Sequence, residues 1–287
     1  MCEEKDQKGT TTMASDIVLS AGVRANLLQL QKTSDLITAT QTKLATGKRV
    51  NTALDNPVNF FTAQSLSNRA SDLGNLLDSM ASAFNTIQAA NNGISSITKL
   101  VQSAQALVSQ AQQTSDTTIR SSLATQFGEI LSQIDQLAGD SGFNGINLLD
   151  SNNSSDLTVM LNETGSSSVT ISAVDFSATG ALALNNSANN WGGSADIAAA
   201  SAELMTALTT LRSQAQAFGS ILSTVQIRQE FTKAMINTLQ TGSDSLTLAD
   251  PNEEGANLLA LQTRQQLSTT ALSLASQASQ AVLRLFQ

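Results

Sequence analysis

The longest regular pattern of apolar residues is a heptad repeat in the first half of the chain. Stepping by seven from Leu73 meets an apolar residue six times, and a second apolar residue follows three positions later in each heptad. The two sets are Leu73, Met80, Ile87, Ile94, Val101 and Val108, and Leu76, Ala83, Ala90, Ile97, Ala104 and Ala111. An unbroken stripe of this kind is typical of a long helix that packs lengthwise on partner helices.

A second stripe lies in the C-terminal half, where apolar residues alternate at three- and four-residue spacings. Its members are Leu204, Leu208, Leu211, Ala215, Phe218, Leu222 and Val225. Between the two stripes, residues 121–137 have a shorter amphipathic pattern that ends at Gly139. A lone helix with one narrow apolar face is marginal in water, so these three segments predict a helical bundle.

The stretch from 141 to 193 has a different character. It contains the sequences GFNGINLLD, LTVML and SVTISAV, separated by clusters of Ser, Asn and Gly. Alternation of apolar and polar residues between such clusters predicts short strands joined by turns. The polar, acidic composition of this β-rich insert predicts that it faces solvent.

Each end of the chain has an apolar stripe of its own. Near the N-terminus the stripe consists of Val23, Leu30, Ile37 and Leu44, with Leu19 and Leu27 beside it. Towards the C-terminus it consists of Leu267, Leu274 and Ala281, with Ala271, Ala278 and Leu285. Two interpretations are open. In the first, the arms form an ordinary coiled coil within one molecule. In the second, their stripes are too narrow to keep the arms folded in an isolated molecule and become buried only between subunits.

Two prolines divide these arms from the bundle. Asn56 precedes Pro57 and Asp250 precedes Pro251, and an N-cap residue followed by proline is a common helix start. The helix before the first proline is expected to end near Gly47. The predicted fold is mainly α, a long antiparallel helical bundle or coiled coil formed by the N- and C-terminal arms, with a small β-rich insert in the middle.

The expected segments follow from these boundaries. They are a disordered extension or tag at 1–12, an N-terminal helix at 13–46, a connection at 47–56, long helices at 57–140, the insert at 141–193, a long helix at 194–243, a connection at 244–250 and a C-terminal helix at 251–287. The extension ends at a second methionine, Met13, which is an alternative start residue.

Composition and charge exclude several classes of function. From 121 to 211 there are nine acidic residues and no Lys or Arg, which argues against nucleic-acid binding. No apolar run approaches the length of a membrane span, and no classical signal peptide is visible. Aromatic residues make up only 3% of the chain, so a thick globular core is not expected.

Catalytic chemistry is also not expected. The chain contains no histidine, so the commonest general base and the commonest metal ligand are both missing. The paired carboxylates Glu253 and Glu254 are explained better by favourable charge at a helix start than by acid–base catalysis. We therefore expect no catalytic residue, no cofactor and no metal site.

Both ends of the chain resemble the bacterial flagellins. At the N-terminal end the resemblance is carried by IVLSAGVRANLLQLQ, LATGKRVNTALDNPVNFFTAQSLSNRASDLGNLLDSM and AFNTIQAANNGISSI, and at the other end by LADPNEEGANLLALQTRQQLSTTALSLASQASQAVLRLF. The turn FNGINLLD is similar as well. The resemblance implies a small flagellin with a reduced outer domain, which self-polymerises into the extracellular flagellar filament used for swimming.

The resemblance also implies partners and roles for residues. Besides copies of itself, the subunit would meet a flagellar cap protein, hook–filament junction proteins, the flagellar export apparatus and an export chaperone. The helices of the inner filament core would include Leu19, Arg24, Leu27, Leu28 and Leu30 on the N-terminal side and Leu267, Leu274, Val282, Leu285 and Phe286 on the C-terminal side. Val23, Ile37 and Leu44 complete this expected self-assembly set.

The Phe60–Phe61 pair and Pro57 depart from the commonest flagellin pattern. For the pair, core packing is favoured over a special contact between subunits. Two alternatives to a filament subunit remain: a hook–filament junction protein, and a secreted coiled-coil effector or host-binding module. Seeded growth into long filaments would separate these classes.

Overall fold

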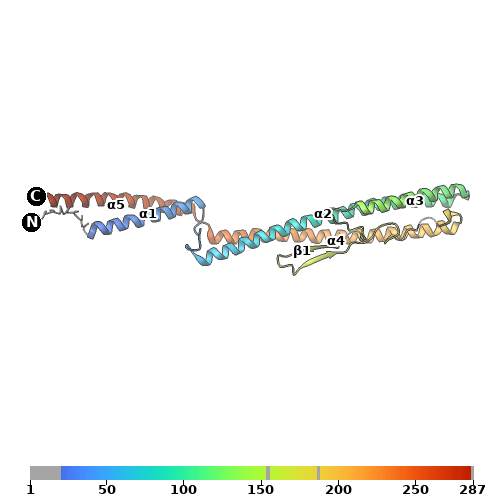
Figure 1. Cartoon of the computed structure of the whole chain (residues 1–287), viewed down its shortest axis with the longest axis horizontal. Helices are drawn as coiled ribbons and strands as arrows, with labels where there is room; N and C mark the ends of the chain where they lie inside the picture. Colours follow the sequence, from blue (N-terminus) through green and yellow to red (C-terminus); the bar gives the residue numbers. More distant parts are fainter. Residues whose placement is uncertain (1–20, 153–155, 186–187, 286–287) are drawn as a thin grey trace, which may run out of the picture. The chain divides into compact units, whose positions relative to one another are not determined.

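The computed structural model describes residues 21–152, 156–185 and 188–285, and it confirms a mainly helical fold with a small antiparallel sheet (Figure 1). Its elements are α1 (Ala21–Thr46), α2 (Pro57–Gln113), α3 (Thr117–Asp140), β1 (Leu157–Met160), β2 (Ser168–Ile171), η1 (Ala188–Trp191), α4 (Ser194–Thr247) and α5 (Pro251–Leu285). The expected extension at 1–12, Leu19 and Phe286 lie outside the described residues. Helix α4 continues to Thr247, past the expected helix end at 243.

The chain divides into two compact units. The first consists of the residues up to Ala63 together with those from Asp244 onwards, and the second of Gln64–Ser243. Helices α2 and α4 each begin or end in the first unit and continue through the second.

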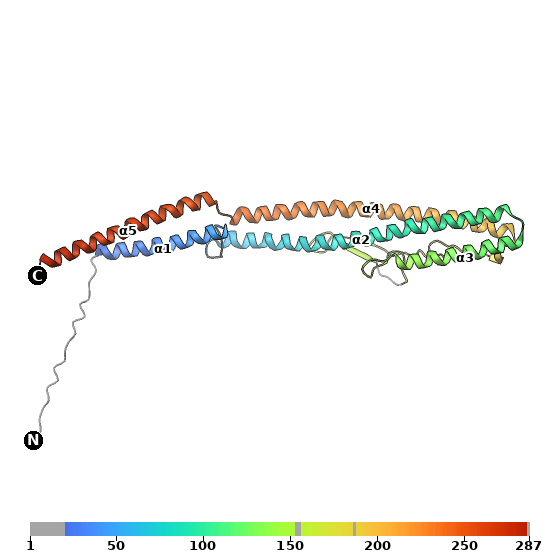
Figure 2. The ribbon, with the colours of Figure 1, turned by 90° about the horizontal axis from the view of Figure 1, so that it is seen from above.

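In the first unit, α1 and α5 lie side by side and run antiparallel (Figures 1 and 2). The centre of the contact is formed by Ile37, which is buried, and by Thr33 and Thr40, which are buried on either side of it. The Thr33 hydroxyl donates a hydrogen bond of 2.8 Å to the carbonyl of Gln29 within its own helix. This small, partly polar core is narrower than that of a typical coiled coil, in which large apolar residues recur at every a and d position.

Backbone hydrogen bonds join the two segments that connect the arms to α2 and α4. The Arg49 amide donates to the carbonyl of Thr247 at 2.7 Å, and the Ala249 amide donates to the carbonyl of Gly47 at 3.0 Å. Gly47 has a φ of +66°, a left-handed conformation that glycine adopts without strain and that ends α1. These bonds hold the two connecting segments next to each other.

The prolines stand where the sequence predicts helix starts. The Asn56 side chain accepts a hydrogen bond of 3.0 Å from the Asn59 amide at the start of α2. The Asp250 side chain accepts one of 2.8 Å from the Asn252 amide at the start of α5. Each proline is the first residue of its helix, where its missing N–H costs no hydrogen bond.

In the second unit, α2, α3 and α4 share one continuous apolar core (Figures 1 and 2). The aromatic residues Phe127, Phe218 and Trp191 are fully buried in it. The rings of Phe127 and Trp191 lie 5.2 Å apart, so η1 packs on α3.

The insert is not purely solvent-facing, contrary to the expectation from its composition. Strands β1 and β2 pair antiparallel, with Leu157 opposite Ile171 and Val159 opposite Val169. Leu157, Val159 and Ile171 are buried, while Thr158 and Thr170, their neighbours in the strands, are exposed. Because side chains alternate between the two faces of a strand, the few apolar residues gather on one face and extend the helical core.

Candidate assembly surfaces

The apolar stripes of α2 and α4 are buried within a single chain. Of the residues in these two stripes, Ala215 and Leu222 are half-buried, and the others are buried. The buried residues include Leu73, Leu76, Met80, Ile87, Ile94, Ile97, Val101 and Val108 on α2 and Leu204, Leu211, Phe218 and Val225 on α4. These residues stabilise the second unit and are not available to a partner.

The stripe of α1 is only partly covered. Ile37 is buried, and Val23 and Leu30 are half-buried against α5. Leu27, Leu28 and Leu44 are exposed, and so is Arg24. The predicted N-terminal residues therefore divide into a set that faces α5 and a set that faces solvent.

The stripe of α5 is the clearest difference from a simple intramolecular coiled coil. Helix α5 contacts α1 through a face that includes Leu258, Leu261 and Leu272, which are half-buried. Leu267 and Leu274, the predicted residues, are 67% and 61% exposed. The predicted stripe thus lies on a face of α5 that α1 does not cover.

Two further predicted residues and two further leucines also lie in these arms. Val282 and Leu285 lie in α5, but their side chains are outside the described set. Leu36 and Leu259 are exposed large apolar residues that sequence reasoning missed. The exposed leucines of the two helices are called here the uncovered arm stripes: Leu27, Leu28, Leu36 and Leu44 on α1, and Leu259, Leu267 and Leu274 on α5.

The heptad pattern alone could not predict that Leu259 is exposed. Leu259 lies in the run NLLALQ beside Leu258 and Leu261, so this run places leucines on two faces of the same helix. Only the position of α1 decides which of those leucines are covered, because both faces are apolar enough to accept a partner.

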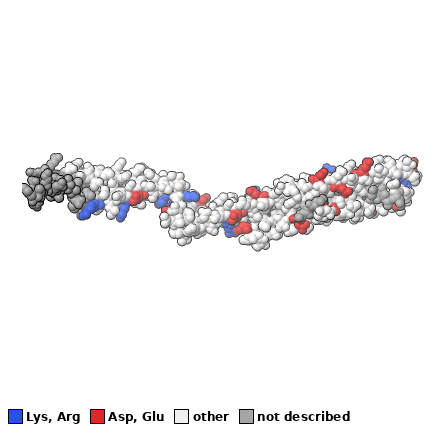
Figure 3. All heavy atoms as spheres, viewed as in Figure 1, with Lys and Arg blue, Asp and Glu red and all other residues white. Residues whose placement is uncertain are grey.

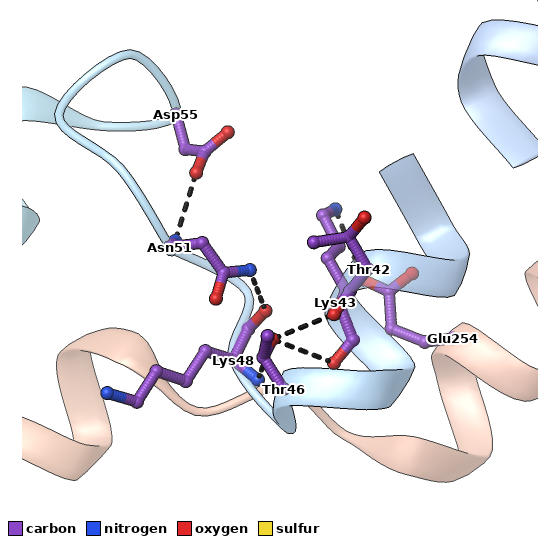
Figure 4. A network of polar contacts seen from close by, with 7 residues as sticks. All are labelled: Thr42, Lys43, Thr46, Lys48, Asn51, Asp55 and Glu254. Atoms are coloured by element: carbon purple, nitrogen blue, oxygen red, sulfur yellow. Dashed lines mark hydrogen bonds and ion pairs between the residues drawn. The ribbon is translucent and has the colours of Figure 1, made fainter. Parts of the chain in front are cut away.

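A polar network fixes the junction between α1, α5 and the connecting segment (Figure 4). The Lys43 ammonium lies 3.2 Å from a carboxylate oxygen of Glu254, a residue that is buried. Glu254 therefore has a structural contact in addition to its favourable position at the start of α5.

In the same network, Asp55 closes the turn before α2. Its Oδ2 atom accepts hydrogen bonds of 2.9 Å from the amides of Asn51 and Thr52. These hydrogen bonds, the one from Thr52 foremost, lower the pKa of Asp55 below its ordinary value of 3.8. The side chain is exposed, so it presents a carboxylate to solvent at neutral pH.

The Phe60–Phe61 pair does not pack as expected. The two rings lie 5.5 Å apart in an edge-to-face arrangement, but Phe61 is 62% exposed and Phe60 only half-buried. Core packing is therefore the wrong interpretation for Phe61, because neighbouring helix residues point to different faces and only one of them can turn inwards.

The remaining surface shows few features of a site for chemistry. Most of the surface drawn in Figure 3 carries neither acidic nor basic side chains. Within the described ranges, no cluster of three or more Cys, Asp or Glu residues is arranged to hold a metal ion. None of the helices, as far as the structure describes them, has the length and apolar character of a membrane span.

The buried bundle core and the exposed leucines of the arms define a class of mainly helical structural proteins. Comparison with known families is specific. The family model of the bacterial flagellin N-terminal helical region matches residues 21–154, and that of the bacterial flagellin C-terminal helical region matches residues 196–286. The chain belongs to the bacterial flagellin family.

Individual relatives agree with the family models along nearly the whole chain. Flagellin FljK of Caulobacter vibrioides is 29% identical over 280 residues, which cover 95% of this chain and 99% of that protein. Flagellin FljN of the same organism is 30% identical over 274 residues, with the same coverage. The crystal structure of Bacillus cereus flagellin is similar with a TM-score of 0.46 at 22% identity, over 55% of this chain and 88% of that one.

The protein is therefore a structural subunit of the extracellular bacterial flagellar filament, and self-polymerisation is its activity. Nothing in the comparisons favours a junction protein or a secreted effector. The FljK and FljN matches extend over almost the whole of both chains, in agreement with a small flagellin that has a short middle region.

Proposed function

We propose that the uncovered arm stripes of α1 and α5 are the surfaces that become buried between neighbouring copies as the filament grows. The observation that carries the proposal is the exposure of Leu267 and Leu274 in a chain whose arms are already paired. Pairing within the molecule leaves these leucines in water, and burial against another copy removes the free-energy cost of their exposure. Copies related by one repeated, non-closing contact then form a helical tube.

This proposal gives each segment a place in the filament. The arms at 13–46 and 251–287 form the inner core, and the bundle segments at 57–140 and 194–243 form the layer around it. The connections at 47–56 and 244–250 join the two layers, and the insert at 141–193 faces outwards. The uninterrupted core of the second unit supports its role as the rigid layer, since it needs no partner to be buried.

The proposed partners act before and during assembly. Besides copies of itself, the subunit meets an export chaperone, the export apparatus, hook–filament junction proteins at the filament base and a cap protein at its growing tip. Exposed leucines on α1 and α5 are suitable contacts for a chaperone that keeps subunits apart before export. The function is mechanical, with no catalytic step, cofactor or metal.

A double substitution on α5 tests the proposal. Leu267→Ser with Leu274→Ser removes two exposed leucines without touching the face that contacts α1, so the helices should form normally. We expect the critical concentration for seeded polymerisation to rise by at least about tenfold, because burial of each leucine contributes about 1–2 kcal/mol. Circular dichroism of the monomer monitors folding, and electron microscopy monitors filament growth.

The matched control is Gln266→Ser with Thr270→Ser, which changes two exposed polar positions on the same helix. It should polymerise like the natural chain. Unchanged growth of the double leucine variant would remove the uncovered arm stripes from the assembly surface.

A further inference from the structure

A second exposed apolar surface lies in the first unit, outside the arms. Leu54, Val58 and Phe61 are 95%, 74% and 62% exposed. Val58 and Phe61 are three residues apart on α2, so they are neighbours on one helix face, and Leu54 lies in the turn just before that helix. These three residues are called the Leu54 patch. Three exposed large apolar side chains within eight residues of the chain indicate a surface that a partner covers.

A negatively charged residue, Asp55, lies within the same stretch of chain as this patch. Asp55 follows Leu54 directly, and its Oδ2 atom accepts hydrogen bonds from the amides of Asn51 and Thr52 and from the Thr52 hydroxyl. Those bonds fix the position of the carboxylate, and they keep it ionised at neutral pH. A complementary surface must therefore offer apolar side chains and, next to them, a positive charge.

The second unit contains a pocket with these properties. It has a volume of about 370 Å³ and is called the Phe231 pocket. Its apolar lining includes Leu73, Leu161, Phe231 and Met235, and its charged lining consists of Arg69, Arg228 and Glu163. Phe231 is itself 55% exposed, so the pocket presents an aromatic ring to solvent.

The two arginines differ in their contacts. Arg69 forms an ion pair with Glu163 of the hairpin turn. Arg228 is exposed and takes part in neither of the ion pairs found among the described residues. Its guanidinium group therefore supplies a positive charge beside the apolar lining.

We propose that the Leu54 patch of one copy docks in the Phe231 pocket of a second copy, with Asp55 facing Arg228. This proposal rests on assembly of the chain into a filament and assigns one contact within it. A second copy is the occupant because it brings both apolar side chains and a carboxylate, in agreement with the charge of the pocket.

Another pocket of the second unit, with a more apolar lining, fits less well. It has a volume of about 340 Å³ and lies between α2 and β1, with Leu76, Ile146 and Leu157 in its lining. None of its lining residues is charged, so it offers Asp55 no partner and would leave that carboxylate partly desolvated. Because the patch and the pocket consist of different residues, a contact between them is heterologous and can repeat from copy to copy without closing.

Cysteine cross-linking tests which surfaces meet. In a Cys2→Ser background, chains with Phe61→Cys are mixed with chains carrying Phe231→Cys, seeded into filaments and mildly oxidised. The matched control replaces the second chain with Met205→Cys, because Met205 is 61% exposed on the same helix but does not line the pocket. Disulfide-linked dimers are measured on a non-reducing gel.

We expect the Phe61→Cys and Phe231→Cys mixture to give dimers in filaments and at least tenfold fewer in the diluted, unpolymerised mixture. Filaments without that disulfide, or with an equal yield in the Met205→Cys control, would overturn this contact and leave the proposed function standing. Failure of the Cys2→Ser parent to form any filament would overturn the proposed function, and this contact with it.

A second measurement avoids cysteine chemistry. Arg228→Glu places a negative charge opposite Asp55, and we expect it to raise the critical concentration for polymerisation about tenfold. Arg212→Glu makes the same charge change at an exposed position of α4 that does not line the pocket, and should have a much smaller effect. Equal effects of the two substitutions would contradict the proposed pairing of Asp55 with Arg228.

Discussion

At the scale of single residues, the junction of the arms depends on a few polar side chains whose roles differ. Glu254 is buried and pairs with Lys43, while its neighbour Glu253 is exposed. The sequence indicated favourable charge at the helix start for both residues, but it indicated no contact of Glu254 with a distant segment. The contact with Lys43 joins positions 211 residues apart in the chain, so only the folded arms reveal it.

Glu254→Gln should weaken the pairing of α1 with α5 by about 1 kcal/mol, because the Lys43 ammonium then loses its ionic partner in a partly buried place. Amide exchange of α1 in the monomer measures the effect. Glu253→Gln, which removes the same charge from the same helix turn, is the control and should change exchange little. Equal acceleration by both substitutions would show that helix-start charge, not the ion pair, is the cause.

Asp55 gives a prediction on pH. Its pKa is lowered in the folded state, so its contribution to the turn is fully present above the ordinary pKa of 3.8 and is lost as the pH falls through the lower, folded value. We expect the amide resonances of Asn51 and Thr52 to stay constant from neutral pH down to about pH 4 and to shift below it. Asp55→Ala should abolish that acid transition, and persistence of the transition in this variant would assign it to another group.

At the scale of elements, close packing between α2 and the turn that follows α3 depends on one glycine. A Cβ atom on Gly93 would lie 2.3 Å from Ser141 Oγ and 2.7 Å from Leu149 Cδ1, which is closer than real contacts allow. In the sequence, Gly93 interrupts a helical pattern and merely lowers its predicted stability. In the tertiary structure Gly93 permits close packing, because the turn can approach the helix only where a side chain is missing.

Gly93→Ala should therefore destabilise the second unit by about 1–3 kcal/mol despite the better helix propensity of alanine. Gly74→Ala is the matched control on the same helix, since a Cβ there meets nothing within 4 Å. That substitution should be neutral or stabilise by up to about 1 kcal/mol. Chemical denaturation followed by the fluorescence of Trp191, the single tryptophan, measures both. Similar effects of the two substitutions would remove the packing argument for Gly93.

At the scale of the whole molecule, the two units differ in how much of their apolar surface is satisfied within one chain. The second unit has a continuous core in which Met80, Ile87 and Phe218 are fully buried. In the first unit, Ile37 and Val50 are buried but most arm leucines remain exposed. Units with few buried apolar contacts open at low free energy, so the arms should be the less protected part of the monomer.

Hydrogen exchange in dilute monomer should thus be at least tenfold faster in α1 and α5 than in the middle of α2, and polymerisation should slow exchange in both arms. Mass spectrometry of monomer and filament, at equal pH and temperature, makes the comparison. Equal protection of arms and bundle in the monomer would mean that the arm helices are complete without neighbours.

The sequence by itself determined the helical class, the two proline-initiated helices, the buried stripe from Leu73 to Val108 and the family. These features follow from local periodicity and capping, which act over a few residues. Tertiary structure decided which leucines of α5 face α1, that Phe61 points into solvent, and that one face of the insert joins the core. Those outcomes depend on which of several apolar faces is covered by another element. A periodic pattern identifies each apolar face but does not show which of them is covered.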